Sequence, residues 1–234
     1  MAVGFTSWTV LPHKPIEKLA PNLWRVSGEM NKGKVQRQMV LARMNDGRVI
    51  VHNAIALDDN EMAELEAWGE PSVIFVPNGF HRQDAFIWKQ RYPKASVIAP
   101  AASKKRVAKA VALDAFTEDA PKDASVRLAP VAGCPSEAIL EVTSDSGVTL
   151  TFCDIVMNLP KIGGPMGFLL GPTGQVTTPR AMRWFFVKDK PAMAAQLEQL
   201  AATPNLTRIC VGHGAPITED PAGALRKVAA QLRG

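Results

Sequence analysis

The chain of 234 residues is 47% hydrophobic and 21% charged, a composition typical of a globular α/β or α+β protein and unlike that of a disordered or collagen-like chain. The net charge of +5 is modest for this length and no basic run is interleaved with aromatic residues, so we expect no nucleic-acid partner. The length and the even composition predict one domain, residues 1–234. The sequence has no run of about 18 apolar residues and no signal-peptide pattern, so we expect no membrane span. Its three cysteines include no CxxC pair, so we expect no disulfide framework and a location in the cytoplasm.

The first third of the chain predicts antiparallel strands. Residues 22–30 form one strand candidate. Residues 35–44 and 48–57 predict two strands joined by a hairpin turn at NDG, whose residues tolerate positive φ. The Asp-rich start of residues 57–70, their periodic apolar side chains and a stopping glycine then predict a helix.

The middle of the chain predicts alternating strands and helices. Buried strands are expected at 71–78 and 95–100, and helices at 81–93 and 103–113. This order favours parallel strands with helices packed on a sheet face. The second helix carries the basic cluster SKKRVAK, which we interpret as a solvated helix face rather than a patch for nucleic acid or an anionic ligand.

The last third begins with a second hairpin and continues with a long segment rich in Gly and Pro. The expected elements are a hairpin at 138–156, an irregular segment at 157–190, a helix at 191–203, a strand at 207–214 and a helix at 221–232. An irregular segment of that length is usually functional or mobile. Its aromatic run WFF is expected to pack inside, although it could help to cover a pocket. The two β-rich halves, each followed by helices, suggest two sheets packed face to face.

Four potential metal ligands fall at strand ends or in the adjoining loops. His81 follows the strand at 71–78, Cys134 precedes a strand, and Asp154 and His213 each follow one directly. Loops at strand ends are where rigid scaffolds usually display chemistry. Imidazole, carboxylate and thiolate are also ligands that zinc and iron accept. The sequence therefore predicts a metal site at these strand ends.

The segments TFCDIVMN and ICVGHGAPI resemble the metallo-β-lactamase superfamily, and the resemblance extends from LAPNLWRV to GHGAPI. In that family the first segment carries an Asp that bridges metals and the second carries the last His ligand, which implies these roles for Asp154 and His213. The resemblance implies a four-layer αββα sandwich, of α+β or α/β class. It also implies hydrolysis by water whose pKa is lowered by metal.

Other segments depart from the family pattern. When GFHRQD is laid over the HxHxDH motif, only His81 is kept outright, and Gly79, Gln83 and Asp84 stand at the other three positions. The stretch PNGFHRQDAFIWKQRYPKASVIAP resembles a subgroup of the superfamily with such a degenerate motif. That likeness implies the fold but no particular reaction.

Two further positions differ in residue type. AGCPSEAILEV resembles the GHTPG loop with Cys134 in place of its His, and a thiolate can still bind zinc. VIVHNAIAL has His52 where the family usually has Asp, and this histidine is either hydrogen-bonded at the strand end or orients a metal ligand. Cys153 and Cys210 lie within apolar strands and are interpreted as core.

With much of a dinuclear ligand set missing, we predict a hydrolase-like protein with one divalent metal, zinc first and iron or manganese as alternatives. His213, Asp154 and His81 would be ligands, and Asp84 or Cys134 a fourth ligand or base, acting on a small-molecule substrate. Each residue also has an interpretation without metal. His213 could be a turn histidine, Asp154 a cap, His81 the flank of a helix and Cys134 a small buried thiol. The alternative is a non-catalytic descendant that binds a small anionic ligand or a partner protein in the same cleft. Thiol chemistry at Cys134 is a third hypothesis.

Overall fold

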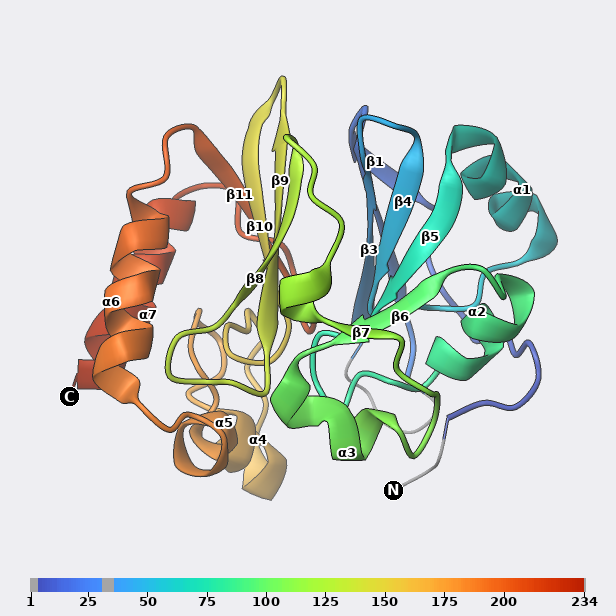
Figure 1. Ribbon diagram of the computed structural model, residues 1–234. Helices are drawn as coiled ribbons and strands as arrows, with labels where there is room; N and C mark the ends of the chain where they lie inside the picture. Colours follow the sequence, from blue (N-terminus) through green and yellow to red (C-terminus); the bar gives the residue numbers. More distant parts are fainter. Residues whose placement is uncertain (1–3, 31–35, 234) are drawn as a thin grey trace.

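The computed structural model describes residues 4–30 and 36–233 (Figure 1). The strands are β1 Glu17–Ala20, β2 Leu23–Gly28, β3 Arg37–Arg43, β4 Arg48–His52, β5 Glu70–Phe75, β6 Ser96–Ala99, β7 Ala115–Phe116, β8 Val126–Pro130, β9 Ala138–Ser144, β10 Gly147–Phe152 and β11 Leu206–Val211. The α-helices are α1 Asp59–Trp68, α2 Ala85–Arg91, α3 Lys104–Val107, α4 Gly164–Leu170, α5 Arg180–Phe185, α6 Lys190–Ala201 and α7 Pro221–Arg233. Two short 3₁₀ helices, η1 Ala101–Ser103 and η2 Thr117–Asp119, complete the set.

Two mixed sheets face each other in the centre of Figure 1, with α1 and α2 outside the larger sheet and α6 and α7 outside the smaller one. The larger sheet has the order β1-β2-β3-β4-β5-β6-β7, and the smaller has β11-β10-β9-β8. Strands β1 to β4 pair antiparallel and β4 to β7 parallel. In the smaller sheet only the β10–β11 pair is parallel. Layers of helix, sheet, sheet and helix result, as the sequence predicted.

Three clusters of buried apolar side chains hold the layers together. The cluster between the sheets joins Val40 and Phe75 of the larger sheet to Leu140, Val142 and Cys210 of the smaller. A second cluster packs α1 and α2 on the outer face of the larger sheet, and a third packs α6 and α7 on the smaller. Each sheet therefore buries both faces, which explains the nearly continuous apolar runs of its central strands.

The predicted elements mostly form, with differences in length. The helix expected at 103–113 is shorter than predicted and consists of α3 alone, preceded by η1. After Val107 the chain continues as a turn, and this turn still brings Val111 into the core beside Val107. Helix α2 is likewise shorter than expected. The short strands β1, β7 and β8 have no strong period of their own and were not predicted. Helices α4 and α5 occupy part of the segment expected to be irregular.

None of the helices in the described ranges is long and apolar enough to cross a membrane. The three cysteines are free and buried. The organisation as a single domain and the location in the cytoplasm stay predictions.

Candidate metal centre

The ends of β5, β10 and β11 bring three side chains to one point. Asp154 lies two residues beyond β10 and His213 two residues beyond β11, and the parallel register pairs Phe152 with Val211, so the two side chains reach the same level. His81 comes from the loop after β5. All three side chains are about nine-tenths buried.

The three side chains have the spacing of ligands to a single ion. His81 Nε2 is 3.1 Å from Asp154 Oδ1 and 3.3 Å from His213 Nε2, and the last pair, His213 Nε2 and Asp154 Oδ1, is 3.5 Å apart. Two ligand atoms at zinc bond lengths and a tetrahedral angle lie about 3.4 Å apart. One metal ion therefore fits between these three atoms.

Hydrogen bonds on the far side of each imidazole fix where its proton lies. His213 Nδ1 donates to the Gln36 carbonyl over 2.8 Å. His81 Nδ1 donates to Asn53 Oδ1 over 3.0 Å, and the amide of Asn53 is oriented because its Nδ2 donates to the Gln38 carbonyl over 2.7 Å. In the neutral rings both Nε2 atoms then present lone pairs toward each other and toward a carboxylate oxygen. Three electron-rich atoms at this spacing require a proton or a metal ion between them.

Buried hydrogen bonds also hold the aspartate. Asp154 Oδ2 accepts from Asn78 Nδ2 over 2.8 Å, which leaves Oδ1 for the centre. The Glu137 carboxylate accepts from the backbone N–H groups of Cys153, Asp154 and Ile155 at 2.9 to 3.2 Å, and from Asn78 Nδ2 at 3.1 Å. Glu137 thus fastens the end of β10 to the loop after β5.

The charges of the centre depend on one another. Burial disfavours the ionised form of Asp154, but His81, His213 and Asn78 outweigh burial and hold the pKa of the carboxyl well below its usual range. Burial likewise disfavours charged His81, and the neighbouring Asp154 more than compensates, so the pKa of His81 is raised. Burial and the charge of His81 lower the pKa of His213. Protonation of His81 is therefore favoured by the Asp154 carboxylate, and a metal ion bound at this centre would compete with that proton.

Cys153 is fully buried, as predicted, and its thiol also lies beside this centre. The ligand atoms of His81, Cys153 and Asp154 all lie within 4.8 Å of one another, so the three form a group that could hold a metal. Burial, with the negative charges of Asp154 and Glu137, raises the pKa of the Cys153 thiol well above its usual value. The thiol stays neutral unless a metal binds it.

Asp84 and Cys134 lie apart from the gathered atoms. The Asp84 carboxylate forms a buried ion pair with Arg37, and burial raises the pKa of Asp84 to about 6 against the opposing effect of Arg37. Cys134 Sγ lies 3.7 Å from Ser136 Oγ within the core of the smaller sheet, where burial raises the pKa of the thiol to about 12. Neither residue is in a potential metal-binding group in the part of the chain that the structure describes.

His52 is fully buried beside Phe75, with ring centroids 5.5 Å apart. Neither of its ring nitrogens has a hydrogen-bond partner among residues 4–30 and 36–233. Burial lowers the pKa of His52 to about 3, and the charge on His81 adds to the shift. The hydrogen bond that orients His81 comes from the next residue, Asn53.

Sequence reasoning missed Asn53, Asn78 and Glu137. Asn53 and Asn78 each follow a strand closely, a position that could have marked them. Asn53 also has a φ of 55°, a left-handed conformation that Asn tolerates better than most residues. Nothing local distinguishes Glu137, because its donors come from the residues that follow β10 and from Asn78 after β5.

No family model matches the chain, and no curated protein matches it either. Among solved structures it is similar to a metallo-β-lactamase from Erythrobacter litoralis with β-mercaptoethanol in the active site. The TM-score is 0.60 at 16% identity, over 92% of this chain and 96% of that one. It is also similar to the DIM-1 metallo-β-lactamase exposed to ceftazidime, with a TM-score of 0.65 at 13% identity over 95% and 99% of the two chains. The chain has a metallo-β-lactamase-like fold. At these identities the likeness is one of fold, and it confirms the predicted architecture.

Proposed function

We propose that this metallo-β-lactamase-fold protein is hydrolase-like and holds one divalent metal ion, zinc first, at His81, Asp154 and His213. One observation carries the proposal. Two imidazole Nε2 atoms, each with the proton fixed on the opposite nitrogen, and one carboxylate oxygen lie 3.1 to 3.5 Å apart. Histidines that bind metal characteristically donate their other ring N–H to an oxygen in this way.

Three protein ligands would leave one tetrahedral position open, as in catalytic rather than structural zinc sites. A metal ion there would polarise the scissile bond of a small-molecule substrate and lower the pKa of water. The surrounding residues would orient the ligands. Gln36 and Asn53 position the imidazoles, and Asn78 holds the carboxylate.

The residues around His81 favour one ion over two. Gly79 and Gln83 replace two ligand positions of the motif, and Asp84 is paired with Arg37. The positive charge of buried Arg37 opposes protonation of both His81 and His213, so a second cation nearby would meet additional repulsion. We therefore propose a degenerate-motif branch of the superfamily.

Elemental analysis of tag-free protein purified without chelators tests the proposal. We expect close to one zinc, iron or manganese per chain, lost in His213→Ala and in Asp154→Ala. His13→Ala is the matched control, because His13 belongs to a separate group with Asp58 and Glu61. Absence of metal after reconstitution, or loss of metal only in His13→Ala, would overturn the proposal and leave the non-catalytic alternative.

Cobalt substitution tests whether the fourth position is open. We expect no thiolate-to-cobalt charge-transfer absorption, because the proposed ligands are His81, Asp154 and His213 and the fourth position is open. A band that disappears in Cys153→Ser but persists in Cys134→Ser would show a closed set of four protein ligands. The metal would then be structural, contrary to the proposal.

A further inference from the structure

A cavity of about 250 Å³ adjoins the metal centre. It is lined by side chains from four separate segments, among them Asn78, Phe80, Arg106, Ser136, Phe186 and Lys188. Asn78 connects the two sites, because its amide also holds Asp154. The volume lies just below the range of about 300–1,000 Å³ of typical ligand pockets, so the cavity suits a small molecule.

Arg106 is held over two aromatic rings at this cavity. Its guanidinium carbon lies 4.4 Å from the ring centroid of Phe80 and 5.6 Å from that of Phe186, and the two rings contact each other edge to face. Stacking of this kind occupies the face of a guanidinium and leaves the N–H groups on its edge free. In the described ranges these groups have no hydrogen-bond acceptor and no acidic partner.

Gly79 allows Arg106 to lie there. A Cβ at position 79 would stand 2.8 Å from both Cβ and Cδ of Arg106, closer than such atoms approach. A side chain at position 79 and the stem of Arg106 therefore compete for the same space. The position where the family motif begins with His is instead covered by this arginine.

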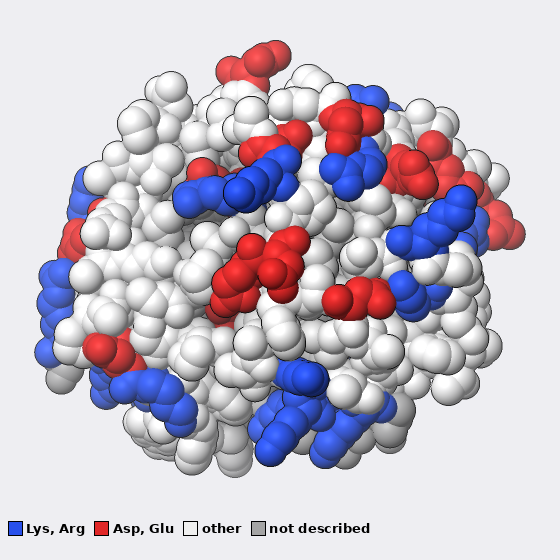
Figure 2. All heavy atoms as spheres, viewed as in Figure 1, with Lys and Arg blue, Asp and Glu red and all other residues white. Residues whose placement is uncertain are grey.

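The two charged side chains that line the cavity, Arg106 and Lys188, are both positive, and the carboxylates of Asp154 and Glu137 lie behind Asn78. Burial and the charge of neighbouring Arg106 lower the pKa of Arg82, and Lys188 lines the cavity and donates to the Phe185 carbonyl over 3.0 Å. No acidic residue occurs in the sequence from 155 to 188. Figure 2 shows Lys and Arg side chains gathered over α3 with no acidic side chain among them. None of the three cations has a salt bridge within the described part of the chain.

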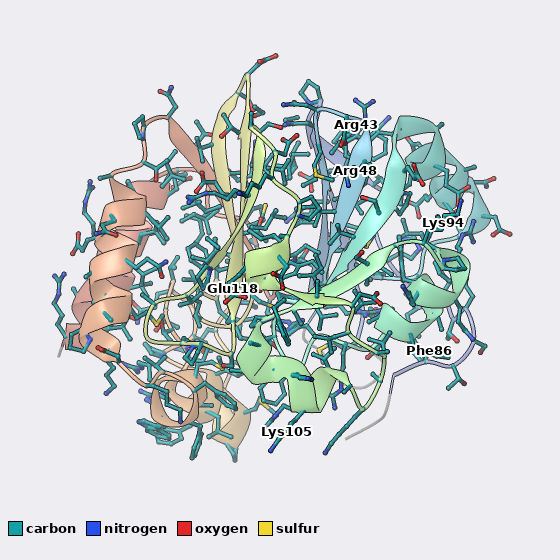
Figure 3. The ribbon with its side chains drawn as sticks, in the orientation of Figure 1. Arg43, Arg48, Phe86, Lys94, Lys105 and Glu118 are labelled. Carbon is teal, nitrogen blue, oxygen red and sulfur yellow. The ribbon has the colours of Figure 1, made fainter. Side chains whose placement is uncertain are left out.

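We propose that this cavity binds a small organic anion. A carboxylate or phosphonate-like group would accept hydrogen bonds from the edge of Arg106 and face Lys188, and an apolar group the size of one ring would lie against Met182 and Phe186. The basic residues of α3 then have different roles. Lys105 points into solvent (Figure 3), whereas Arg106 lines the cavity and would bind the anion. The proposal depends on the cavity alone and does not require a bound metal.

Calorimetric titration of the full chain with benzoate, phenylphosphonate and the neutral benzyl alcohol tests the proposal. We expect at least one of the two anions to bind, and benzyl alcohol to bind about tenfold more weakly, since a charged hydrogen bond is lost. Arg106→Ala should weaken anion binding by about tenfold or more. Lys105→Ala removes the same charge from the same helix and should leave binding unchanged. Comparison of the two anions identifies the preferred head group.

Further variants separate the cavity from the metal centre and from effects on folding. Arg106→Lys keeps the charge and should bind with intermediate affinity, because the forked geometry is lost. His81→Ala should retain anion binding. The proposal is overturned if neither anion binds the wild-type chain, if Arg106→Ala and Lys105→Ala behave alike, if benzyl alcohol binds as tightly as the anions, or if only His81→Ala abolishes binding.

Discussion

The two sheets contribute unequally to the candidate metal centre. The larger sheet supplies only His81, from a loop, whereas the smaller sheet supplies Asp154 and His213 from the ends of two parallel neighbours. In the smaller sheet the ligands follow strands whose register is set by the ladder, and Glu137 secures the backbone at Asp154. The two candidate ligands from the smaller sheet therefore lie where buried backbone hydrogen bonds fix the chain.

In the loop after β5 of the larger sheet, Gly79 and Asp84 make contacts away from the candidate metal centre. Gly79 makes room for Arg106, and Asp84 compensates the buried charge of Arg37. These side chains lie outside the strand ladders. The comparison teaches that the strand ends of the smaller sheet hold their polar side chains through the ladder, whereas the loop of the larger sheet holds its side chains through individual side-chain contacts.

Removal of Arg37 should have the largest effect on stability. Arg37→Met leaves Asp84 buried without its partner, and we expect a loss of about 3–5 kcal/mol in the free energy of unfolding by urea. Asp84→Leu added to Arg37→Met should recover most of that loss, because no buried charge remains. If Arg37→Met lowers the free energy of unfolding by less than about 1 kcal/mol, the ion pair between Arg37 and Asp84 is exposed to solvent rather than buried.

Removal of Glu137 tests the other half of the comparison. Glu137→Ala leaves three buried backbone N–H groups without their acceptor and removes one of the two acceptors of Asn78, so we expect a loss of about 3 kcal/mol in unfolding free energy. Glu141→Ala is the control, because Glu141, on β9, pairs with exposed Arg127 of the neighbouring strand β8. If both variants lose the same free energy of unfolding, Glu137 does not hold the end of β10 in place.

His52 should make the protein less stable in acid. Burial lowers its folded-state pKa to about 3 from the ordinary 6.5, so between these values the unfolded chain binds the extra proton. This contribution is complete above pH 6.5 and is lost as the pH falls, by up to about 1.4 kcal/mol per pH unit. Urea unfolding at several pH values should show a shallower dependence in His52→Leu. Equal slopes in both proteins would contradict a buried neutral imidazole.

Gly79→Ala should have the smallest effect on stability and a specific effect on the cavity. The added Cβ displaces the stem of Arg106, which we expect to cost about 1 kcal/mol and to weaken benzoate binding. Gly163→Ala is the control, since a Cβ there would meet nothing within 4 Å. Unchanged benzoate affinity in Gly79→Ala would mean that the loop does not position Arg106.

Local patterns predicted most of the fold. The NDG turn, the apolar runs and the stopping Gly69 marked β3, β4 and α1, because each depends on residues close in sequence. Their places at strand ends or in adjoining loops marked His81, Cys134, Asp154 and His213 as candidate ligands, and the structure brings all of these except Cys134 together. The resemblance to the metallo-β-lactamase superfamily supplied the arrangement of the layers, which the comparisons with solved structures confirm.

Only the tertiary structure decided which polar side chains meet. Asn78 bonds a carboxylate 76 positions away, and His81 and His213 approach across 132 positions. Cys153 rather than Cys134 gathers at the centre. Such pairings follow from the packing of two sheets and of α3 against a loop, so no local period or spacing encodes them. The chain by itself therefore determined its elements and its candidate ligands, and the packing of the sheets determined the site.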